Sequence, residues 1–557
     1  MRSTRGSKRS RDQLGGAMLV RLVLAAAILA LTACQVAPVP GVATPTPTPA
    51  GSADVGGTFR VALTADPTTL DPWNANDANT LLVTRQIFET LVDYEPGGFK
   101  IVPKLAESWS VSPDGRSWTF ALRRGVKFHD GTDLDAAAVV LNFDRARQTA
   151  HPLHGAPGAD RYRAYATLLE GFDDTSVIAR VEAKDSMTVV ITTKLPFGPL
   201  LADLAMPSFA IASPKSLRDD PAGWATLASS GAAGTGPFVF RSGAWQLGQQ
   251  VTLERNGAYW AKDPGGTQMP YVDRVVLRVI KDESARIGEL RSGGLDAVRD
   301  VTVATLSTVK ADPNLQLLPR PALNVGYLGI APTAPFDKVE VRRAVAMAID
   351  RSLLATTLYS GVGRPASQLL APGMLGYDDS VLEFYRLDTA GAKRLLADGG
   401  VPSGFATELW YPPAWRAQYP DPKRVAESIA ADLAKIGLVV SLRTEDAATY
   451  RADARADRLP LWIGDAGGES ADPDSFFSDG GAWAGDIVRE LLRRARYEAD
   501  ASKRTELYKQ VSKLIQQDAS RIPLLLAEGL VAATKKVRGL APHPIGVEAY
   551  SQVWLGR

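Results

Sequence analysis

The stretch KRVAESIAADLAKIGLVVSL, residues 423–442, predicts a helix, a stop and a strand in direct succession. Four apolar residues fall on one face of a helix over residues 423–436: Val425, Ile429, Leu433 and Ile436. Gly437 follows where a glycine commonly ends a helix, because it adopts the left-handed backbone conformation without strain. Residues 439–442 form a short apolar run, which predicts a strand.

The same alternation recurs along the chain. Residues 189–192 and 275–280 are further apolar runs that predict strands. Residues 341–354 place six apolar side chains on one helical face: Val341, Ala344, Val345, Ala348, Ile349 and Leu353. The sequence therefore predicts a mixed α/β protein.

The length of the chain predicts more than one lobe. It has 557 residues, and single hydrophobic cores stop growing at about 250 to 300 residues. Beyond residue 56 no long Pro, Ser or Gly linker divides the sequence, and no repeat of about 20 to 50 residues is evident. We therefore expect two or three lobes between which the chain crosses and returns.

The one cysteine stands behind an apolar run near the N-terminus. Six basic residues precede or border the uncharged run at residues 22–31, which has the length of a signal-peptide core and is too short to span a membrane. Residues 31–33, Leu-Thr-Ala, directly precede Cys34 and resemble a bacterial lipobox. Cys34 is therefore predicted to carry a lipid anchor, with the Pro- and Thr-rich residues 38–49 as a semi-rigid tether. The alternative is an uncleaved anchor or an ordinary signal peptide with an incidental cysteine.

The exported part has no basic excess. Six of the 63 Lys and Arg side chains and one of the 61 Asp and Glu side chains lie before Cys34, so the remainder has three more acidic than basic groups. This balance gives no sign of a face that binds nucleic acid or a membrane. A mature chain without a free thiol suits an oxidising compartment.

Patterns typical of catalysis are few. The sequence has no GxSxG elbow, HExxH zinc helix or GxxxxGK[ST] phosphate loop. Residues 231–238, GAAGTGPF, lack the lysine and hydroxyl of a phosphate loop and predict a turn before a strand. His151 and His154 have no evident third ligand, so we interpret them as surface loop histidines. We expect no metal, no cofactor and no enzymatic activity.

Aromatic and acidic residues supply the candidate ligand-binding groups. Trp410, Tyr411 and Trp415 follow a predicted strand, where α/β folds place ligands, although such a cluster builds a core or rigid loop as readily. Asp472 is a further candidate, although Asp472 and Asp474 in ADPDS are also typical turn and cap residues.

Six blocks of sequence resemble, in order, the blocks of one family, the extracellular solute-binding proteins, family 5. This family serves ABC importers of dipeptides, oligopeptides, nickel chelates and some glycosides. The longest block is IVPKLAESWSVSPDGRSWTFALRRGVKFHDGT, residues 101–132. The others are GGTFRVALTADPTTLDP (56–72), GTGPF (234–238), LERNGAYW (253–260), VRRAVAMAIDRSLL (341–354) and ADPDSF (471–476).

The resemblance implies a type II periplasmic-binding-protein fold of the α/β class. Two lobes would enclose a ligand cleft, with an extra domain inserted in lobe one. The expected segments are a signal peptide at 1–33, a tether at 34–56, lobe one at 57–99, 189–281 and 528–557, the inserted domain at 100–188, and lobe two at 282–527.

The resemblance also implies capture of a solute rather than its conversion. Ligand between the lobes favours the closed state, which a permease could recognise. The family's amine-anchoring acid stands four residues before the proline of an Asp-Pro step, which is Glu469 here, where aspartate is usual. Ala466 stands where tryptophan is usual, and Asp465 is a rival anchor. Glu469 is expected to bind the free amino group of a peptide.

This departure leaves the ligand class open. The leading hypothesis is a lipid-anchored peptide-binding protein of an ABC importer. The alternatives are the same scaffold with a metal chelate or glycoside as ligand, and a surface-anchored hydrolase. Expected partners are the solute, the transmembrane subunits of the permease and, through Cys34, the membrane, but not nucleic acid. We expect a monomer, exported and anchored to the outer face of the cell membrane or in the periplasm.

Overall fold

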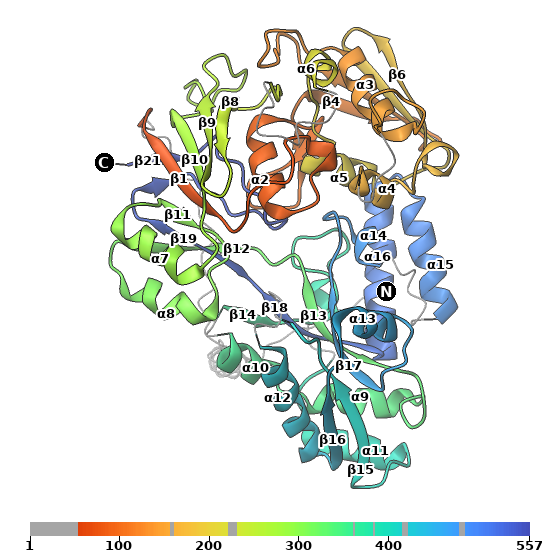
Figure 1. Cartoon of the computed structure of the whole chain (residues 1–557). Coiled ribbons are helices and arrows are strands. Elements are labelled where there is room, and N and C mark those ends of the chain that lie inside the picture. Colours follow the sequence, from red (N-terminus) through yellow and green to blue (C-terminus); the bar gives the residue numbers. More distant parts are fainter. Residues whose placement is uncertain are drawn as a thin grey trace, which may run out of the picture. The chain divides into compact units, whose positions relative to one another are not determined.

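A computed structural model describes seven stretches of the chain: residues 54–155, 161–220, 231–359, 362–381, 385–414, 421–477 and 485–556. These residues form a mixed α/β protein with three larger sheets (Figure 1), which confirms the predicted class. The predicted signal peptide, most of the tether, Cys34 and Trp415 lie outside the described residues.

The first sheet has seven strands in the order β12-β19-β11-β1-β10-β9-β8. Its strands are β1 (Thr58–Leu63), β8 (Phe238–Gln246), β9 (Gln250–Arg255), β10 (Arg274–Val279), β11 (Ala297–Val298), β12 (Leu315–Arg320) and β19 (Gly529–Thr534). The helices from the same parts of the chain are α2 (Ala78–Ile87), α6 (Pro214–Asp219), α7 (Glu283–Ser292) and α8 (Val303–Ala311). β1 runs parallel to β10, whereas β19 pairs antiparallel with both β11 and β12.

The second sheet has six strands in the order β14-β18-β13-β17-β15-β16. Its strands are β13 (Val325–Ile330), β14 (Gly363–Pro365), β15 (Phe405–Trp410), β16 (Leu438–Arg443), β17 (Leu461–Ala466) and β18 (Arg521–Ala527). The helices of this part are α9 (Val339–Ala348), α10 (Arg351–Leu358), α11 (Thr389–Asp398), α12 (Pro422–Lys435), α13 (Ala447–Arg455), α14 (Pro473–Phe476), α15 (Gly485–Arg496) and α16 (Ala501–Asp518).

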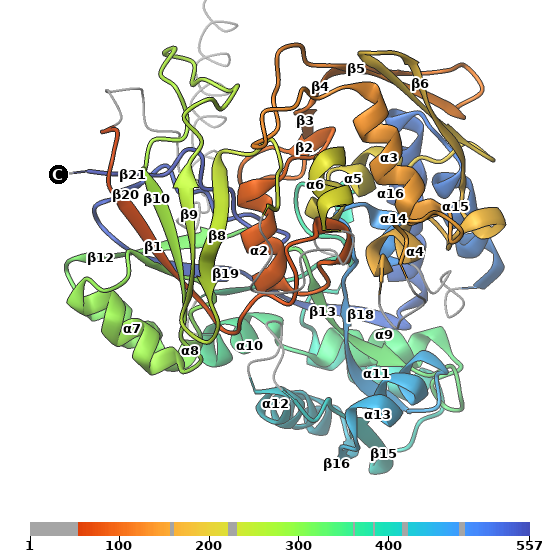
Figure 2. The same cartoon turned by 45° about the horizontal axis from the view of Figure 1, so that its top comes forward.

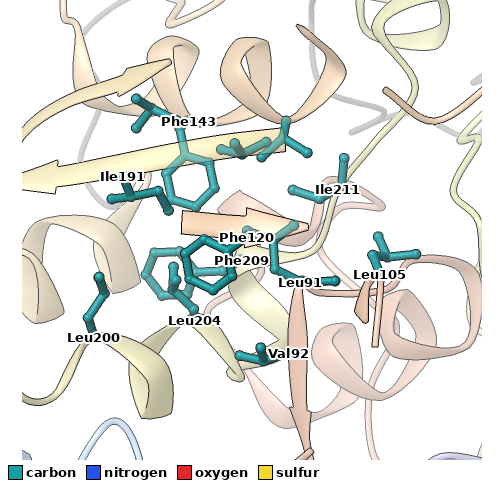
Figure 3. Packing of buried hydrophobic residues seen from close by; sticks show 14 of the residues in the cluster. Leu91, Val92, Leu105, Phe120, Phe143, Ile191, Leu200, Leu204, Phe209 and Ile211 are labelled. Carbon is teal, nitrogen blue, oxygen red and sulfur yellow. The ribbon is translucent and has the colours of Figure 1, made fainter. Parts of the chain in front are cut away.

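The third sheet is antiparallel, in the order β4-β5-β7-β6, and comes from residues 106–193. Its strands are β4 (Ala106–Val111), β5 (Ser117–Leu122), β6 (Ile178–Asp185) and β7 (Thr188–Thr193), with α3 (Ala136–Arg147), α4 (Arg163–Leu168) and α5 (Leu200–Leu204) nearby in sequence. Figure 3 shows the core here, where Phe120 of β5, Phe143 of α3 and Ile191 of β7 pack together, all fully buried.

Smaller elements complete the described chain. Two short antiparallel pairs are β2 (Val92–Tyr94) with β3 (Ile101–Pro103) and β20 (Val537–Arg538) with β21 (Trp554–Leu555). Short 3-10 helices lie at Pro72–Asn74, Asp173–Thr175, Pro207–Phe209 and Asp379–Val381. None of the helices within the described ranges is both long and apolar enough to cross a membrane.

The chain passes between the first two sheets at two places. β12 ends at Arg320 and β13 begins at Val325, and β18 ends at Ala527 before β19 begins at Gly529. A Cβ on Gly529 would lie 3.1 Å from Nη1 of Arg320, so the two crossing segments pack closely. The chain therefore leaves one sheet, builds another and returns, as expected for two lobes.

Strand pairing suggests a different start for lobe two. β11 and β12 lie within residues 282–527, the segment predicted for lobe two, yet both pair with β19 of the first sheet. A division after Arg320 fits the sheets better than one after residue 281. The assignment of segments to lobes, with this change, is a proposal.

The stretch of residues 423–442 folds as its pattern predicts. Asp421 caps α12 by accepting a hydrogen bond from the backbone N–H of Arg424 at 3.1 Å, and Val425, Ile429 and Leu433 are buried. Gly437 has a φ of +93°, the left-handed conformation that stops a helix, and β16 follows.

The helix predicted over residues 341–354 is wrong as a single element. The structure has α9 and α10, with Ile349 and Asp350 between them. The Asp350 side chain accepts a hydrogen bond from the N–H of Leu353 at 2.8 Å, so it starts a new helix where the apolar spacing alone suggested continuity.

Several residues of the family-like blocks converge on one buried carboxylate, Glu89. Thr235, Tyr259 and Trp260 donate hydrogen bonds to it at 2.8, 2.6 and 2.8 Å. Lys104 forms an ion pair with it at 3.2 Å. A buried carboxylate requires hydrogen-bond donors and a cation. Residues of GTGPF and LERNGAYW supply these donors to Glu89 inside the first lobe.

The two glycines of GTGPF, Gly234 and Gly236, are required by close packing. A Cβ on Gly234 or Gly236 would collide with the backbone of Ile87 at the end of α2. The predicted turn before a strand is confirmed, since β8 begins at Phe238.

Candidate functional site

The candidate site is the segment that includes the last two residues of β17 and the loop beyond it, residues 465–474. β17 pairs antiparallel with β13, which places Asp465 opposite Gly326, and its first three residues are buried. Asp465 and Glu469 are exposed, whereas Ser470, Ala471 and Asp472 are buried. The segment thus presents two acids outward and sends the next residues into the interior.

Glu469 faces a cation from a distant part of the chain. Its Oε1 lies 3.5 Å from Nη2 of Arg163, the first residue of α4, and the two side chains are 52% and 54% exposed. The sequence between residues 459 and 483 has no Lys or Arg, so the fold supplies a partner that local sequence does not.

The glycines beside Glu469 do not leave open space. A Cβ on Gly467 would lie 2.5 Å from Oδ1 of Asn324, and one on Gly468 would collide with the hydroxyl of Ser475. These glycines allow the chain to pack against its own side chains.

Asp472 has a structural role. It is 4% exposed, and its two oxygens accept hydrogen bonds from Arg504 of α16 at 2.7 and 2.9 Å. It also caps α14 by accepting from the N–H of Asp474 at 2.9 Å. Asp472 was predicted to contact ligand, but its carboxylate instead binds Arg504 and caps α14.

The buried part of the segment contacts residues from the first half of the chain. The hydroxyl of Tyr94 donates to the carbonyl of Ala202 at 2.8 Å and accepts from the N–H of Ala471 at 3.3 Å. Burial raises the pKa of Asp203 well above its ordinary value, and the neighbouring Asp472 raises it further. Asp203 therefore favours its neutral form at this contact.

The same contact extends to the C-terminal helices. The N–H of Gly198 donates to the carbonyl of Arg496 at 2.9 Å, and Nη1 of Arg504 donates to the carbonyl of Gly198 at 3.1 Å. Arg496 also pairs with Glu170 at 2.6 Å. Figures 1 and 2 both show α14 and α16 beside α4 and α5.

Trp410 and Tyr411, the members of the predicted aromatic cluster that the structure describes, pack in different places. Trp410 packs with a small cluster around Trp462 and Tyr450, whereas Tyr411 packs against the main core of the second sheet. The indole N–H of Trp410 donates to Glu408 at 3.2 Å. Because the two side chains join different clusters, they do not line one shared pocket.

A cavity of about 830 Å³ lies behind the buried part of the segment. Its wall includes Ala471 and Asp472, and also Tyr94, Trp118, Leu375 and Arg504, but Glu469 does not line it. A volume in this range accommodates a small organic molecule. The cavity and the exposed acid are thus two distinct places.

The two loop histidines are not both on the surface. His154 is 8% exposed, packs against Tyr162 and Phe172, and its Nδ1 lies 2.9 Å from the carbonyl of Arg145. The prediction of a surface position is wrong for His154, because the ring fills a gap in an aromatic cluster. Within the described ranges no group of three or more His, Cys, Asp and Glu side chains is arranged to hold a metal.

Sequence reasoning missed Arg163, Arg504 and Asp203. Each meets the segment from a distant part of the chain, so neither spacing nor local charge indicates it. One signal was available for Arg163. Because the sequence near Glu469 has no Lys or Arg, any cation that pairs with Glu469 must come from a distant part of the chain.

Two α/β lobes joined at two crossings are the architecture of two-lobed binding proteins. The profile of the bacterial extracellular solute-binding proteins, family 5, matches residues 100–485. The chain belongs to this family.

Individual relatives align with this chain over most of their lengths. Heme-binding protein A of Haemophilus influenzae is 32% identical over 486 residues, covering 84% of this chain and 86% of the relative. The dipeptide-binding protein of Escherichia coli is 31% identical over 492 residues, covering 84% and 88%. The structure of HbpA2 from Haemophilus parasuis superposes with a TM-score of 0.81 at 29% identity, over 90% of this chain and all of that one. The predicted two-lobed binding-protein fold is thereby confirmed.

Proposed function

We propose that this chain is the lipid-anchored substrate-binding protein of an ABC importer, and that it captures short peptides between its lobes and delivers them to the permease. The observation that carries the proposal is Glu469, an exposed carboxylate at the position of the family's amine anchor. The likeness to a dipeptide-binding protein over most of both chains supports a peptide as ligand. Closure over the ligand follows from contacts that only the closed state makes from both sides.

Glu469 would pair with the free α-amino group of the peptide. Its present partner, Arg163, is exposed and 3.5 Å away, and such pairs contribute about 0 to 1 kcal/mol. An ammonium can therefore replace the guanidinium at small cost. Of the other candidates, Asp465 stays a proposed rival anchor, Trp410, Tyr411 and Trp415 stay proposed contacts, and Asp472 is reassigned to the interior.

Calorimetry with a dipeptide and its N-acetylated form tests the amine anchor. Glu469→Gln and N-acetylation should each weaken binding by about 30-fold or more, the equivalent of roughly 2 to 5 kcal/mol for a broken charge pair. Combined, they should cost little more than either alone, because both remove the same interaction.

Two control variants sharpen this test. Glu427→Gln changes an exposed glutamate on α12 that also has a basic partner, and it should leave affinity unchanged. Leu375→Trp fills the cavity behind the segment and should also leave affinity unchanged. If acetylation costs nothing, the ligand is not held by its amine, and a metal chelate or glycoside becomes the better proposal.

Heme is a second candidate ligand, because one relative of 32% identity is a heme-binding protein. An absorbance titration distinguishes it: heme that competes with a dipeptide for one site would favour this candidate. Turnover of any peptide would instead favour the hydrolase alternative.

The proposed anchor is tested by Cys34→Ser. The protein should move from the membrane fraction to the soluble fraction, because one acylated residue is the proposed attachment. A variant that stays with the membrane after salt washing would contradict the lipid anchor and favour the uncleaved apolar run.

A further inference from the structure

Arg163 is held in place at the start of α4 by an ordered network. The preceding Tyr162 is fully buried and has a φ of +52°, which costs free energy in a non-glycine residue. Its backbone N–H donates to Oδ1 of Asn74 at 3.0 Å, and its hydroxyl donates to the carbonyl of Leu153 at 3.1 Å. Nη1 of Arg145 donates to the same hydroxyl at 3.3 Å.

This network is itself anchored. Arg145 is buried and forms a two-point ion pair with Asp71, at 2.7 and 2.8 Å. Strained backbone persists only where surrounding contacts over-determine it, and such positions concentrate at functional sites. The backbone that carries Arg163 is therefore fixed, while its guanidinium remains half-exposed.

Glu469 is the acid that pairs with Arg163, at 3.5 Å between Oε1 and Nη2. When a ligand's ammonium takes Glu469, Arg163 loses its partner but stays a few ångströms away, free to act on the ligand's nearest side chain.

We infer that Arg163 is a specificity-determining residue, which favours peptides whose first side chain is acidic over those whose first side chain is basic. The inference rests on the proposed function, since it requires the peptide amine at Glu469. Its physical cause is Coulombic: the unpaired guanidinium attracts a first-position carboxylate and repels a first-position ammonium.

Calorimetry with Asp-Ala, Asn-Ala and Lys-Ala tests the inference, because Asn-Ala has the shape of Asp-Ala without its side-chain charge. The wild type should bind Asp-Ala about 10-fold more tightly than Lys-Ala, with Asn-Ala between them. Arg163→Gln should bring the three affinities to within about 3-fold, and Arg163→Glu should reverse their order. High salt should reduce the wild-type preference.

Arg180→Gln is the matched control. Arg180 is also an exposed arginine paired with a glutamate, Glu182 at 2.8 Å, but it lies on β6. This variant should keep the wild-type order of affinities, and the ratio among peptides is insensitive to small changes in overall stability.

The outcomes separate this inference from the proposed function. If N-acetylation of Asn-Ala weakens binding but Arg163→Gln leaves the Asp-to-Lys ratio unchanged, the role of Arg163 is overturned and the amine anchor stands. If N-acetylation has no effect, or the dipeptides do not bind, the proposed function fails and this inference with it.

Discussion

Asp474 is a carboxyl group whose surroundings oppose its charge. Burial raises its pKa to about 6. The positive charge of Arg496, 3.6 Å away, acts in the other direction and favours the ionised form. The folded protein therefore holds this proton more tightly than the unfolded chain, whose aspartates titrate at about 3.9. Because the unfolded state then binds fewer protons between about pH 4 and pH 6, stability should fall as pH rises through that range.

Asp474→Asn removes this dependence. Between about pH 4 and pH 6 the free energy of unfolding of the wild type should fall by roughly 2 to 3 kcal/mol relative to the variant, measured by urea denaturation at each pH. Asp379→Asn, an exposed acid, serves as control and should follow the wild type. If the free energies of unfolding of the wild type and Asp474→Asn changed in parallel with pH, Asp474 would not be the cause of the pH dependence.

α14 and α16 are joined by the buried pair of Asp472 and Arg504. Both side chains are 5% exposed, so removing one charge leaves the other uncompensated in the interior. Asp472→Asn should cost about 3 to 5 kcal/mol of stability in denaturant unfolding. Glu490→Gln breaks an exposed pair with Arg493 and should cost less than about 1 kcal/mol. Equal costs for the two variants would mean that the buried pair does not hold these helices together.

Elements were predictable from sequence where the signal was local. The strands near residues 189, 275 and 439 and the stop at Gly437 are present, because apolar spacing and a left-handed glycine depend on neighbouring residues. The break at Asp350 was missed because a cap competes with apolar periodicity, which continues across it. Position in the family pattern indicated Glu469, but its partner Arg163 depends on the tertiary fold.

The whole molecule should change its dimensions when it binds. A peptide between two lobes that are joined at two crossings should reduce the radius of gyration in small-angle scattering. Saturating peptide at about 100 times its Kd should also stabilise the protein by about 2.7 kcal/mol and raise its melting temperature. Glu469→Gln, if its affinity is about 30-fold weaker, should gain only about 0.9 kcal/mol at the same peptide concentration, because the peptide is then at about 3 times the variant's Kd. Saturating peptide that alters neither quantity in the wild type would contradict closure.

β19 has a consequence for how the protein is made. It lies between β12 and β11 within the seven-stranded sheet, yet it comes from residues 529–534, whereas β1 comes from residues 58–63. A chain emerging from a ribosome or a secretion pore releases β1 first and β19 almost last. Until then β11 and β12 have open edges, which attract other strands, and pairing over so long a separation is slow. The first sheet can therefore be completed only after nearly the whole chain has emerged.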